Sequence, residues 1–365
     1  MKILFFVNSL GGGGAERVCV NLANEYVARG VDVYFITLFK NKAYQDDKKN
    51  FNILCLNLQK EDSKICIIKN ILDNRKRINT FILENSIIEP YVLITAHLPL
   101  SHICASISLV GSECLYVQHT SLWGSKFKFY LFYKNFYKEK INVCVSNGLA
   151  KEFIDVIGYT NKNIRVIFNP ILIDDIKMHA KENFHYPKPY ILCVGRLSQE
   201  KRFDRAIRIF FEGKYYIKYQ LVILGEGEKR KELESWAKRF ELEKFIYFAG
   251  WQKNVYMWMH HAELLLHTSE YEALPMVLIE ALASKTRIVA SNCKFGADEI
   301  LTGELEKFIA NKDDISDYIK KINAALREFP LNCDYEILKK CDSSFVAQQY
   351  LNVYKQYFGN DIHKY

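Results

Sequence analysis

The sequence predicts an α/β protein built from two doubly wound parallel-sheet domains. Its 365 residues suffice for two domains at about 100 to 200 residues each. Apolar runs of strand length alternate with amphipathic segments of helical length along the chain, an order that produces a parallel sheet with helices on both faces. The alternation restarts after Pro187 and Pro189, so we expect the hinge within residues 168–189.

The individual elements follow from apolar runs and the helical patterns between them. Continuous apolar runs are typical of parallel strands buried on both faces. In the first half they predict strands at 2–10, 31–39, 91–96, 114–119 and 141–146, with a helix from the glycines to Gly30. In the second half, strands at 190–196, 219–227, 244–250, 263–269 and 286–292 alternate with helices at 203–213, 229–240, 255–262 and 275–284.

Composition excludes several classes of protein. With 49% hydrophobic and 25% charged residues and seven prolines, the chain is globular and not disordered. The ten cysteines form no CxxC pair and no Cys/His cluster, which argues against a zinc or redox site and suits a reducing cytosol. No apolar run reaches the roughly 18 residues that span a bilayer, and MKILFFVNSL is too short for a secretion signal. We therefore expect a soluble or peripheral protein.

Positive charge is concentrated in the first half of the chain. Residues 1–170 contain 21 Lys and Arg against 14 Asp and Glu, within a total net charge of +8. Residues 126–140 combine an aromatic stripe at helical spacing with five lysines, among them Lys126, Lys128, Lys134 and Lys138. Such a helix either binds an anionic membrane or an acceptor, or packs its aromatic side chains on its own sheet with solvated lysines outside.

The four glycines at 11–14 follow the first strand and open a helix near Ala15. Glycines let the backbone approach a ligand, and free N–H groups at a helix start favour an anion. A dinucleotide GxGxxG pattern would require glycine at Glu16 or Arg17, and no GK[ST] follows for a P-loop. The segment is either a phosphate-binding loop, with Gly13 and Gly14 as donors, or a plain tight turn.

Charged residues follow two strands of the second half. Arg196 and Lys201 follow the strand at 190–196, where they either neutralise a diphosphate or are solvated. Glu272 lies in the loop after the strand at 263–269, and Glu280 lies in the next helix, which Pro275 suits at its first turn. Carboxylates accept hydrogen bonds from neighbouring hydroxyls, so the pair suits a sugar and a ribose. The alternative is a capping Glu272 and a surface Glu280.

Two histidines follow strands of the first half. His119 ends the strand at 114–119, and His97 lies at a similar place after 91–96. A histidine at the carboxyl end of such a strand donates to a substrate oxygen or carries a proton near neutral pH. We favour His119 over His97 for this role, with a purely structural histidine as the alternative.

Taken in order, these segments resemble the family 4 retaining glycosyltransferases of the GT-B fold, also called glycosyl transferases group 1. Nine motifs carry the resemblance, namely 7–33, YVQHTS, VCVSNGLAKEF, IFNPI, 191–207, 221–234, 248–259, the Glu272-x7-Glu280 motif and 288–301. The glutamate motif and GR-x4-K are the most specific of the nine. Ala273 and Leu274 stand where the family usually has Gly-Phe.

The resemblance implies two Rossmann-like doubly wound domains facing a central cleft. We place the acceptor-side domain at 1–169, the donor-side domain at 170–342, and a helix at 343–365 that crosses back to the first domain. Gly13 and Gly14 would contact the donor's phosphates, Arg196 and Lys201 would hold its diphosphate, and Glu280 would bind ribose. His119 and Glu272 would contact the transferred sugar as catalytic residues. The donor-contacting segment after Glu272 comprises Ala273, Leu274, Pro275 and Met276.

The resemblance further implies transfer with retention of configuration and no cofactor or metal ion. We expect a hexose or N-acetylhexosamine, carried by a nucleotide diphosphate and UDP-linked, to pass to a growing lipid-linked or cell-surface polysaccharide. We expect a cytoplasmic enzyme, peripheral on an anionic membrane face. The alternative on the same fold is a UDP-sugar 2-epimerase or hydrolase. A nucleic-acid binder is a remote alternative, because the charge is modest and no recognition motif appears.

Overall fold

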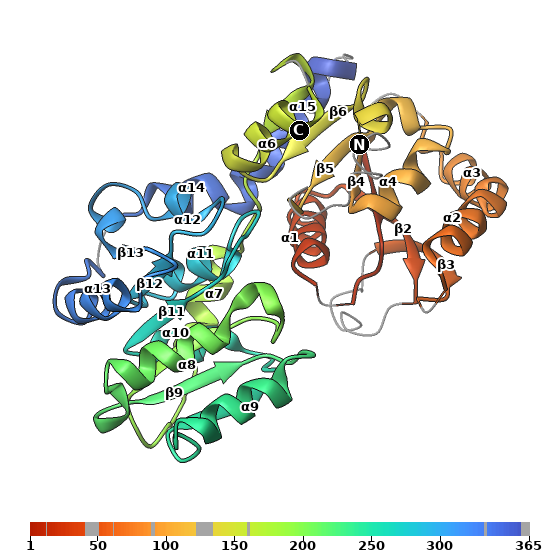
Figure 1. Ribbon diagram of the computed structural model, residues 1–365. Helices are drawn as coiled ribbons and strands as arrows, with labels where there is room; N and C mark the ends of the chain where they lie inside the picture. Colours follow the sequence, from red (N-terminus) through yellow and green to blue (C-terminus); the bar gives the residue numbers. More distant parts are fainter. Residues whose placement is uncertain are drawn as a thin grey trace. The chain divides into compact units, whose positions relative to one another are not determined.

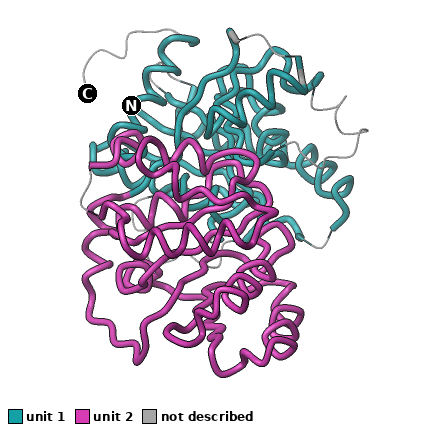
Figure 2. The backbone as a smooth tube through the Cα atoms, turned by 60° about the vertical axis from the view of Figure 1, so that its left-hand side comes forward, with its two compact units in different colours: residues 1–171, 341–365 teal, residues 172–340 magenta. Residues whose placement is uncertain are grey.

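The computed structural model describes residues 1–11, 13–40, 51–60, 62–88, 92–121, 134–158, 161–331 and 334–358. The chain forms two compact units (Figure 2). Unit 1 consists of residues 1–171 and 341–365, and unit 2 consists of residues 172–340.

Unit 1 is built on a parallel sheet with the strand order β3-β2-β1-β4-β5-β6-β7 (Figure 1). The strands are β1 (Lys2–Val7), β2 (Asp32–Phe39), β3 (Phe51–Leu58), β4 (Val92–His97), β5 (Leu115–Gln118), β6 (Ile141–Cys144) and β7 (Ile164–Val166). The helices are α1 (Gly14–Ala28), α2 (Lys64–Asp73), α3 (Arg75–Glu84), α4 (Pro99–Ser106), α6 (Asn147–Ile157) and α15 (Ser343–Phe358). Residues Ile3 to Val7 of β1 are fully buried, as a strand covered on both faces requires.

Unit 2 repeats this arrangement with the strand order β10-β9-β8-β11-β12-β13. Its strands are β8 (Tyr190–Val194), β9 (Gln220–Leu224), β10 (Ile246–Gly250), β11 (Leu264–His267), β12 (Ile288–Ser291) and β13 (Ile309–Ala310). Its helices are α7 (Ile173–Ala180), α8 (Phe203–Glu212), α9 (Arg230–Arg239), α10 (Val255–His261), α11 (Met276–Ala283), α12 (Ala297–Ile300), α13 (Ile315–Glu328) and α14 (Glu336–Cys341).

These two sheets confirm the predicted fold class of two doubly wound parallel-sheet domains. In both, the first strand is flanked by the second and the fourth, which is the strand order of Rossmann-like folds. The sequence analysis did not identify β3, β7 and β13, of which β7 and β13 are only three and two residues long. In such sheets ligands bind outside the carboxyl ends of the strands where the order reverses. That point lies between β1 and β4 in unit 1 and between β8 and β11 in unit 2.

The last helix, α15, belongs to unit 1 and packs against α1. The Tyr26 hydroxyl on α1 donates to the Ala347 carbonyl at 3.0 Å, and Arg29 Nη2 donates to the Ser344 carbonyl at 2.9 Å. Tyr26 is fully buried, so the helix contact is part of the core of unit 1. The chain thus ends on the unit in which it began.

Gly225, just after β9, is required where two loops meet at the carboxyl edge of the unit 2 sheet. Its φ is +129°, and a Cβ there would lie 1.9 Å from the Gly195 carbonyl oxygen. Both the positive φ and the close approach exclude any other residue without movement of the loop after β8.

We therefore expect Gly225→Ala to lower the free energy of unfolding of unit 2 by about 3 kcal/mol, from strain and overpacking together. Gly303→Ala is the matched control, because its φ is +59° but a Cβ there meets nothing within 4 Å. The control should lose only about 1 kcal/mol. Urea denaturation followed by tryptophan fluorescence measures both values, and equal losses would contradict the steric argument.

Candidate active site

The candidate site of unit 2 lies where β8 and β11 end side by side. The two strands pair in parallel, with Ile191 opposite Leu264 and Leu192 opposite Leu265. The loop after β8 carries Arg196 and Lys201, and the loop after β11 carries Glu272. Segments about 70 residues apart in the chain therefore meet at the carboxyl edge of this sheet, at the reversal of strand order.

The loop after β8 is held in place by the loop after β9. The Leu197 N–H donates to the Glu226 carbonyl at 3.0 Å, and the Lys229 N–H donates to the Leu197 carbonyl at 2.9 Å. A Cβ at Gly227 would lie 2.4 Å from the Leu197 oxygen, so glycine is needed for this approach. These contacts fix the backbone between Arg196 and Lys201.

Two further hydrogen bonds join the loop after β8 to the loop after β11. The Thr268 hydroxyl donates to the Lys201 carbonyl at 3.0 Å, and the Glu270 N–H donates to the Glu200 carbonyl at 2.8 Å. The two loops that carry Lys201 and Glu272 are therefore joined by hydrogen bonds that do not involve the side chains of these two residues.

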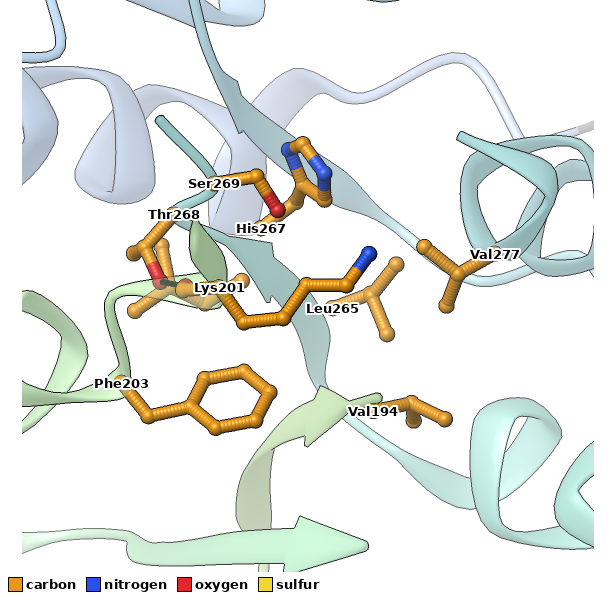
Figure 3. Close-up of a pocket in the computed structure, with 9 residues that line it drawn as sticks. Val194, Lys201, Phe203, Leu265, His267, Thr268, Ser269 and Val277 are labelled. Atoms are coloured by element: carbon orange, nitrogen blue, oxygen red, sulfur yellow. Dashed lines mark hydrogen bonds between the residues drawn. The ribbon is translucent and has the colours of Figure 1, made fainter. Parts of the chain in front are cut away.

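The Glu272 carboxylate receives three donors on a single oxygen. Its Oε1 lies 2.6 Å from Lys201 Nζ, 2.7 Å from the Ser269 hydroxyl and 3.2 Å from His267 Nε2. Lys201, His267 and Ser269 also line a small cavity, in which the lysine side chain extends between Phe203 and His267 (Figure 3). Because a carboxylate only accepts, His267 must carry a proton on Nε2.

Glu272 is ionised even though its side chain is only 12% exposed. Burial alone would raise the pKa of Glu272, but attraction to the Lys201 ammonium, with hydrogen bonds from His267 and Lys201, lowers that pKa to about 2. Within the described part of the chain, Oε2 of Glu272 makes no hydrogen bond, so it can accept from a ligand.

Glu270, which the sequence analysis did not consider, is the centre of a second charged cluster beside the first. Its carboxylate pairs with Arg205 Nη2 at 2.8 Å, with Arg202 Nη1 at 3.3 Å and with Lys312 Nζ. Burial opposes ionisation of this carboxyl, but hydrogen bonds from Lys312 and Arg205 leave its pKa below the usual value. The cluster joins the start of α8 to the Glu272 loop. Its only sequence signal is a second acid two residues before Glu272.

The other predicted donor-site residues of unit 2 lie in the same loops or in α11. The Arg196 side chain is exposed and makes no hydrogen bond or ion pair within the described residues. Leu274 and Pro275 are buried beneath the start of α11, where a Cβ at Gly296 would meet Pro275 Cδ at 2.5 Å. Ala273 and Met276, and Glu280 on α11, are half-buried.

In unit 1, the described glycines wrap around the side chain of Glu16. The N–H groups of Gly11 and Gly13 donate to Glu16 Oε2 at 3.0 and 2.9 Å, and the Ser9 hydroxyl donates to Oε1. The N–H of Gly14 begins α1 and makes no hydrogen bond within the described residues. Of the two predicted phosphate donors, Gly14 has an open N–H, whereas Gly13 donates to this carboxylate. Glutamate three residues into a helix after glycines was the sequence signal for this contact.

The two candidate histidines of unit 1 are bonded to each other. His97, fully buried at the end of β4, places Nδ1 2.8 Å from Nε2 of His119, which follows β5. Burial lowers the pKa of His119 to about 3, and burial and the neighbouring imidazoles of His119 and His102 lower that of His97. Both rings are neutral at pH 7. His97 and His119, expected from the sequence as alternatives for one role, are therefore hydrogen-bonded partners.

Part of the predicted basic aromatic segment lies outside the described residues, including Lys126 and Lys128. In the described part, Lys134 and Lys138 are exposed. Tyr137 is buried, and its hydroxyl donates to His102 Nδ1 at 2.6 Å. This portion fits the alternative in which aromatic side chains pack on the sheet and lysines face solvent.

Two family models together match residues 12–336. The model of Glycosyltransferase Family 4 matches residues 12–175, and the model of Glycosyl transferases group 1 matches residues 174–336. The chain is a family 4 glycosyltransferase. The resemblance drawn from its motifs is thereby confirmed, as is its assignment to the sugar transferases.

The similarity to known proteins and solved structures covers almost the whole length of this glycosyltransferase. An N-acetylgalactosamine-N,N'-diacetylbacillosaminyl-diphospho-undecaprenol 4-alpha-N-acetylgalactosaminyltransferase of Campylobacter jejuni is 24% identical over 92% of this chain and 93% of its own. A glycosyltransferase crystal structure from Rickettsia africae superposes with a TM-score of 0.76 at 17% identity, covering 99% of each chain. HepE of Anabaena, solved with UDP and glucose, superposes with a TM-score of 0.70 at 18% identity, covering 98% of each chain. The two structures have the same fold.

No described helix is long and apolar enough to cross a membrane. No group of three or more His, Cys, Asp or Glu side chains in the described ranges is arranged to hold a metal ion.

The lowered pKa of Glu272 predicts a pH-dependent contribution to stability. Because the folded pKa of about 2 lies below the ordinary 4.5, ionised Glu272 stabilises the fold fully above about pH 4.5 and loses this contribution as pH falls through about 2. The melting temperature of Glu272→Gln should therefore lie furthest below that of the wild type at pH 7, with the gap narrowing below pH 4.5. The exposed Glu243, changed to Gln, is the control. A gap for Glu272→Gln that stays constant from pH 7 to 2.5 would contradict the assignment.

Proposed function

We propose that this glycosyltransferase moves a hexose or N-acetylhexosamine from a UDP-sugar to a lipid-linked or cell-surface glycan, with retention of configuration. The observation that carries the donor assignment is the Lys201–Glu272 pair at the reversal of strand order in unit 2. It places a cation and an oriented carboxylate at the edge where such sheets bind nucleotides.

The chemistry of the pair matches the two ends of a sugar diphosphate. An ammonium has three N–H donors, so Lys201 can bind phosphate with two while the third remains on Glu272. The guanidinium of Arg196, which has no partner among the described residues, supplies a planar fork for a second phosphate oxygen. Glu272 Oε2 accepts from sugar hydroxyls, and Glu280 on α11 accepts from those of ribose.

The reaction we propose needs no metal ion. The acceptor hydroxyl oxygen attacks the anomeric carbon from the face on which the diphosphate departs. The nucleoside diphosphate leaves with the bonding electron pair, and the hydroxyl proton passes to its phosphate oxygen. Lys201 and Arg196 stabilise the negative charge that develops on the leaving group, which is preorganised electrostatic catalysis. The Gly14 N–H would add a backbone donor, the Gly13 N–H would do so only by leaving Glu16, and His119 would bind the sugar.

Known proteins support the choice of donor and acceptor. HepE of the same fold has been solved with UDP and glucose. The name of the Campylobacter jejuni relative specifies an acceptor linked to undecaprenol through a diphosphate. An acceptor of that kind is held at a membrane and carries negative charge, which suits the basic first half of this chain. We therefore place the enzyme in the cytoplasm, at the membrane surface.

We expect Lys201→Ala and Glu280→Ala each to reduce kcat/KM for transfer about 100-fold or more, because each variant lacks one charged contact to the nucleotide sugar. UDP should raise the melting temperature of the wild type but of neither variant. Lys231→Ala, at an exposed lysine on α9, is the control and should keep both properties. Wild-type turnover in the Lys201 and Glu280 variants would remove the site assignment. UDP release that is equally fast without any acceptor would indicate a hydrolase or epimerase instead.

Charge reversal tests the membrane part of the proposal. Glutamate at Lys126, Lys128, Lys134 and Lys138 should reduce binding to liposomes that contain anionic lipid, because each lysine near such a surface contributes about 1 kcal/mol. The control reverses four exposed lysines of unit 2, namely Lys188, Lys231, Lys238 and Lys320. Cosedimentation at two salt concentrations measures the effect. Unchanged partitioning of the first variant, or an equal loss in the control, would refute a role for these lysines.

A further inference from the structure

A chain of three hydrogen-bonded side chains ends at His119 on the carboxyl edge of the unit 1 sheet. Thr95 and His97 belong to β4, and His119 follows the neighbouring strand β5, which pairs His97 with Val117. His97 Nε2 lies 3.2 Å from the Thr95 hydroxyl oxygen, and His97 Nδ1 lies 2.8 Å from His119 Nε2. Thr95 and His97 are buried, whereas His119 is half-buried.

The direction of the hydrogen bonds follows from what Thr95 can reach. Within the described residues, the Thr95 hydroxyl has no side-chain partner other than His97 Nε2. If the imidazole donated to Thr95, the hydroxyl hydrogen would be buried without an acceptor, which is the more costly arrangement. If Thr95 donates, its hydrogen and the His97 lone pair are both satisfied. His97 then carries its one proton on Nδ1.

The same reasoning assigns the opposite tautomer to the neighbouring His102. Its Nε2 lies 3.0 Å from the Ala96 carbonyl and 3.1 Å from the Val117 carbonyl, and carbonyl oxygens only accept. Its Nδ1 accepts from the Tyr137 hydroxyl at 2.6 Å. His102 therefore carries its proton on Nε2, and it serves as an internal reference for the opposite tautomer.

We propose that Thr95 and His97 fix the tautomer of His119, so that its Nδ1–H is presented as a neutral hydrogen-bond donor to a ligand oxygen. His97 Nδ1–H donates to His119 Nε2, which leaves the single proton of His119 on Nδ1. His119 Nδ1 has no partner among the described residues. His97 is a positioning residue in this arrangement. That the ligand oxygen belongs to the donor sugar rests on the proposed function.

The arrangement limits what His119 can do chemically. A neutral ring with Nδ1–H can donate a hydrogen bond to a hydroxyl or phosphate oxygen, but it cannot accept a proton at that nitrogen. His119 would therefore orient a ligand and would not act as a general base through Nδ1. A site built to donate to one oxygen discriminates against ligands that lack this oxygen.

Nitrogen NMR on the full chain labelled with [15N]histidine tests the tautomers directly. At pH 7 and without ligand, we expect His97 and His119 to be protonated on Nδ1 and His102 on Nε2, with assignments from His97→Asn, His102→Asn and His119→Asn spectra. A proton on Nε2 of His119, or on both of its nitrogens, would overturn the proposal. This readout needs no substrate, so it decides the tautomer even if the proposed transfer reaction fails.

Two substitutions of His97 separate positioning from packing. Asparagine can place an N–H near the position of Nδ1, whereas leucine cannot. We expect His97→Leu to give mixed His119 tautomers and about a tenfold lower kcat/KM for transfer, and His97→Asn to restore both. Melting temperatures of the two variants identify any loss of folding. Transfer at the wild-type rate by a folded His97→Leu, or equal losses in both variants, would overturn the positioning role.

Substitutions of two buried threonines test the hydrogen bond between Thr95 and His97, with Thr37 as the matched control. Thr95→Val removes the hydroxyl that donates to His97, and we expect the minor His119 tautomer to become detectable. Thr37→Val removes a buried hydroxyl on β2 that has no hydrogen-bond partner in the described part of the chain, so it should leave the histidine spectrum unchanged. An unchanged spectrum in Thr95→Val, or the same change in Thr37→Val, would show that Thr95 does not direct the tautomer.

Discussion

The ion pair between Lys201 and Glu272 depends on the hydrogen bonding of β8 to β11. The two strands are adjacent because the strand order reverses between them, and their loops then leave the sheet on the same edge. The hydrogen bonds from the Thr268 hydroxyl and the Glu270 N–H to the carbonyls of Lys201 and Glu200 form because of that adjacency. Without this pairing, a lysine and a glutamate about 70 positions apart in the chain would have no reason to meet. The strand order of unit 2 therefore brings together the two charged side chains of its candidate site.

Burial of this pair is tolerated because the two charges offset each other and two further donors reach Glu272. Taking a carboxylate out of water costs several kcal/mol unless donors replace the solvent. Glu272 Oε1 receives an ammonium, an imidazole N–H and a hydroxyl, and its pKa stays low. Glu270, bonded to Arg202, Arg205 and Lys312, holds the loop that carries Glu272. One oxygen of Glu272 is thus fixed by the protein while the other is left for a ligand.

Sequence patterns predict the part of this structure that depends on periodicity and chain order. Alternating apolar runs gave the two sheets, and the positions of Lys201 and Glu272 just after strands placed them at one edge. Glu270 and the His97–His119 bond were missed, because each depends on side-chain directions that spacing does not encode. Glu16 was missed although its place three residues into α1 is a known signal for a contact with the preceding backbone. His97 and His119 are 22 residues apart, and they meet only because β4 pairs with β5. A sequence can therefore indicate which histidines lie at the ends of strands, but not that two of them are hydrogen-bonded to each other.

The two units supply donors of different electrical character. Of the unit 1 residues predicted to contact the nucleotide sugar, Gly14 and His119 offer neutral N–H donors, and the N–H groups of Gly11 and Gly13 already donate to Glu16. A phosphate at Gly13 would replace one anion by another, so its net gain there is small. The cations Lys201 and Arg196 of unit 2 make no such exchange, since Lys201 keeps two free N–H donors and Arg196 is unpaired in the described structure. In the proposed reaction, the charge of the leaving group is therefore stabilised mainly by Lys201 and Arg196.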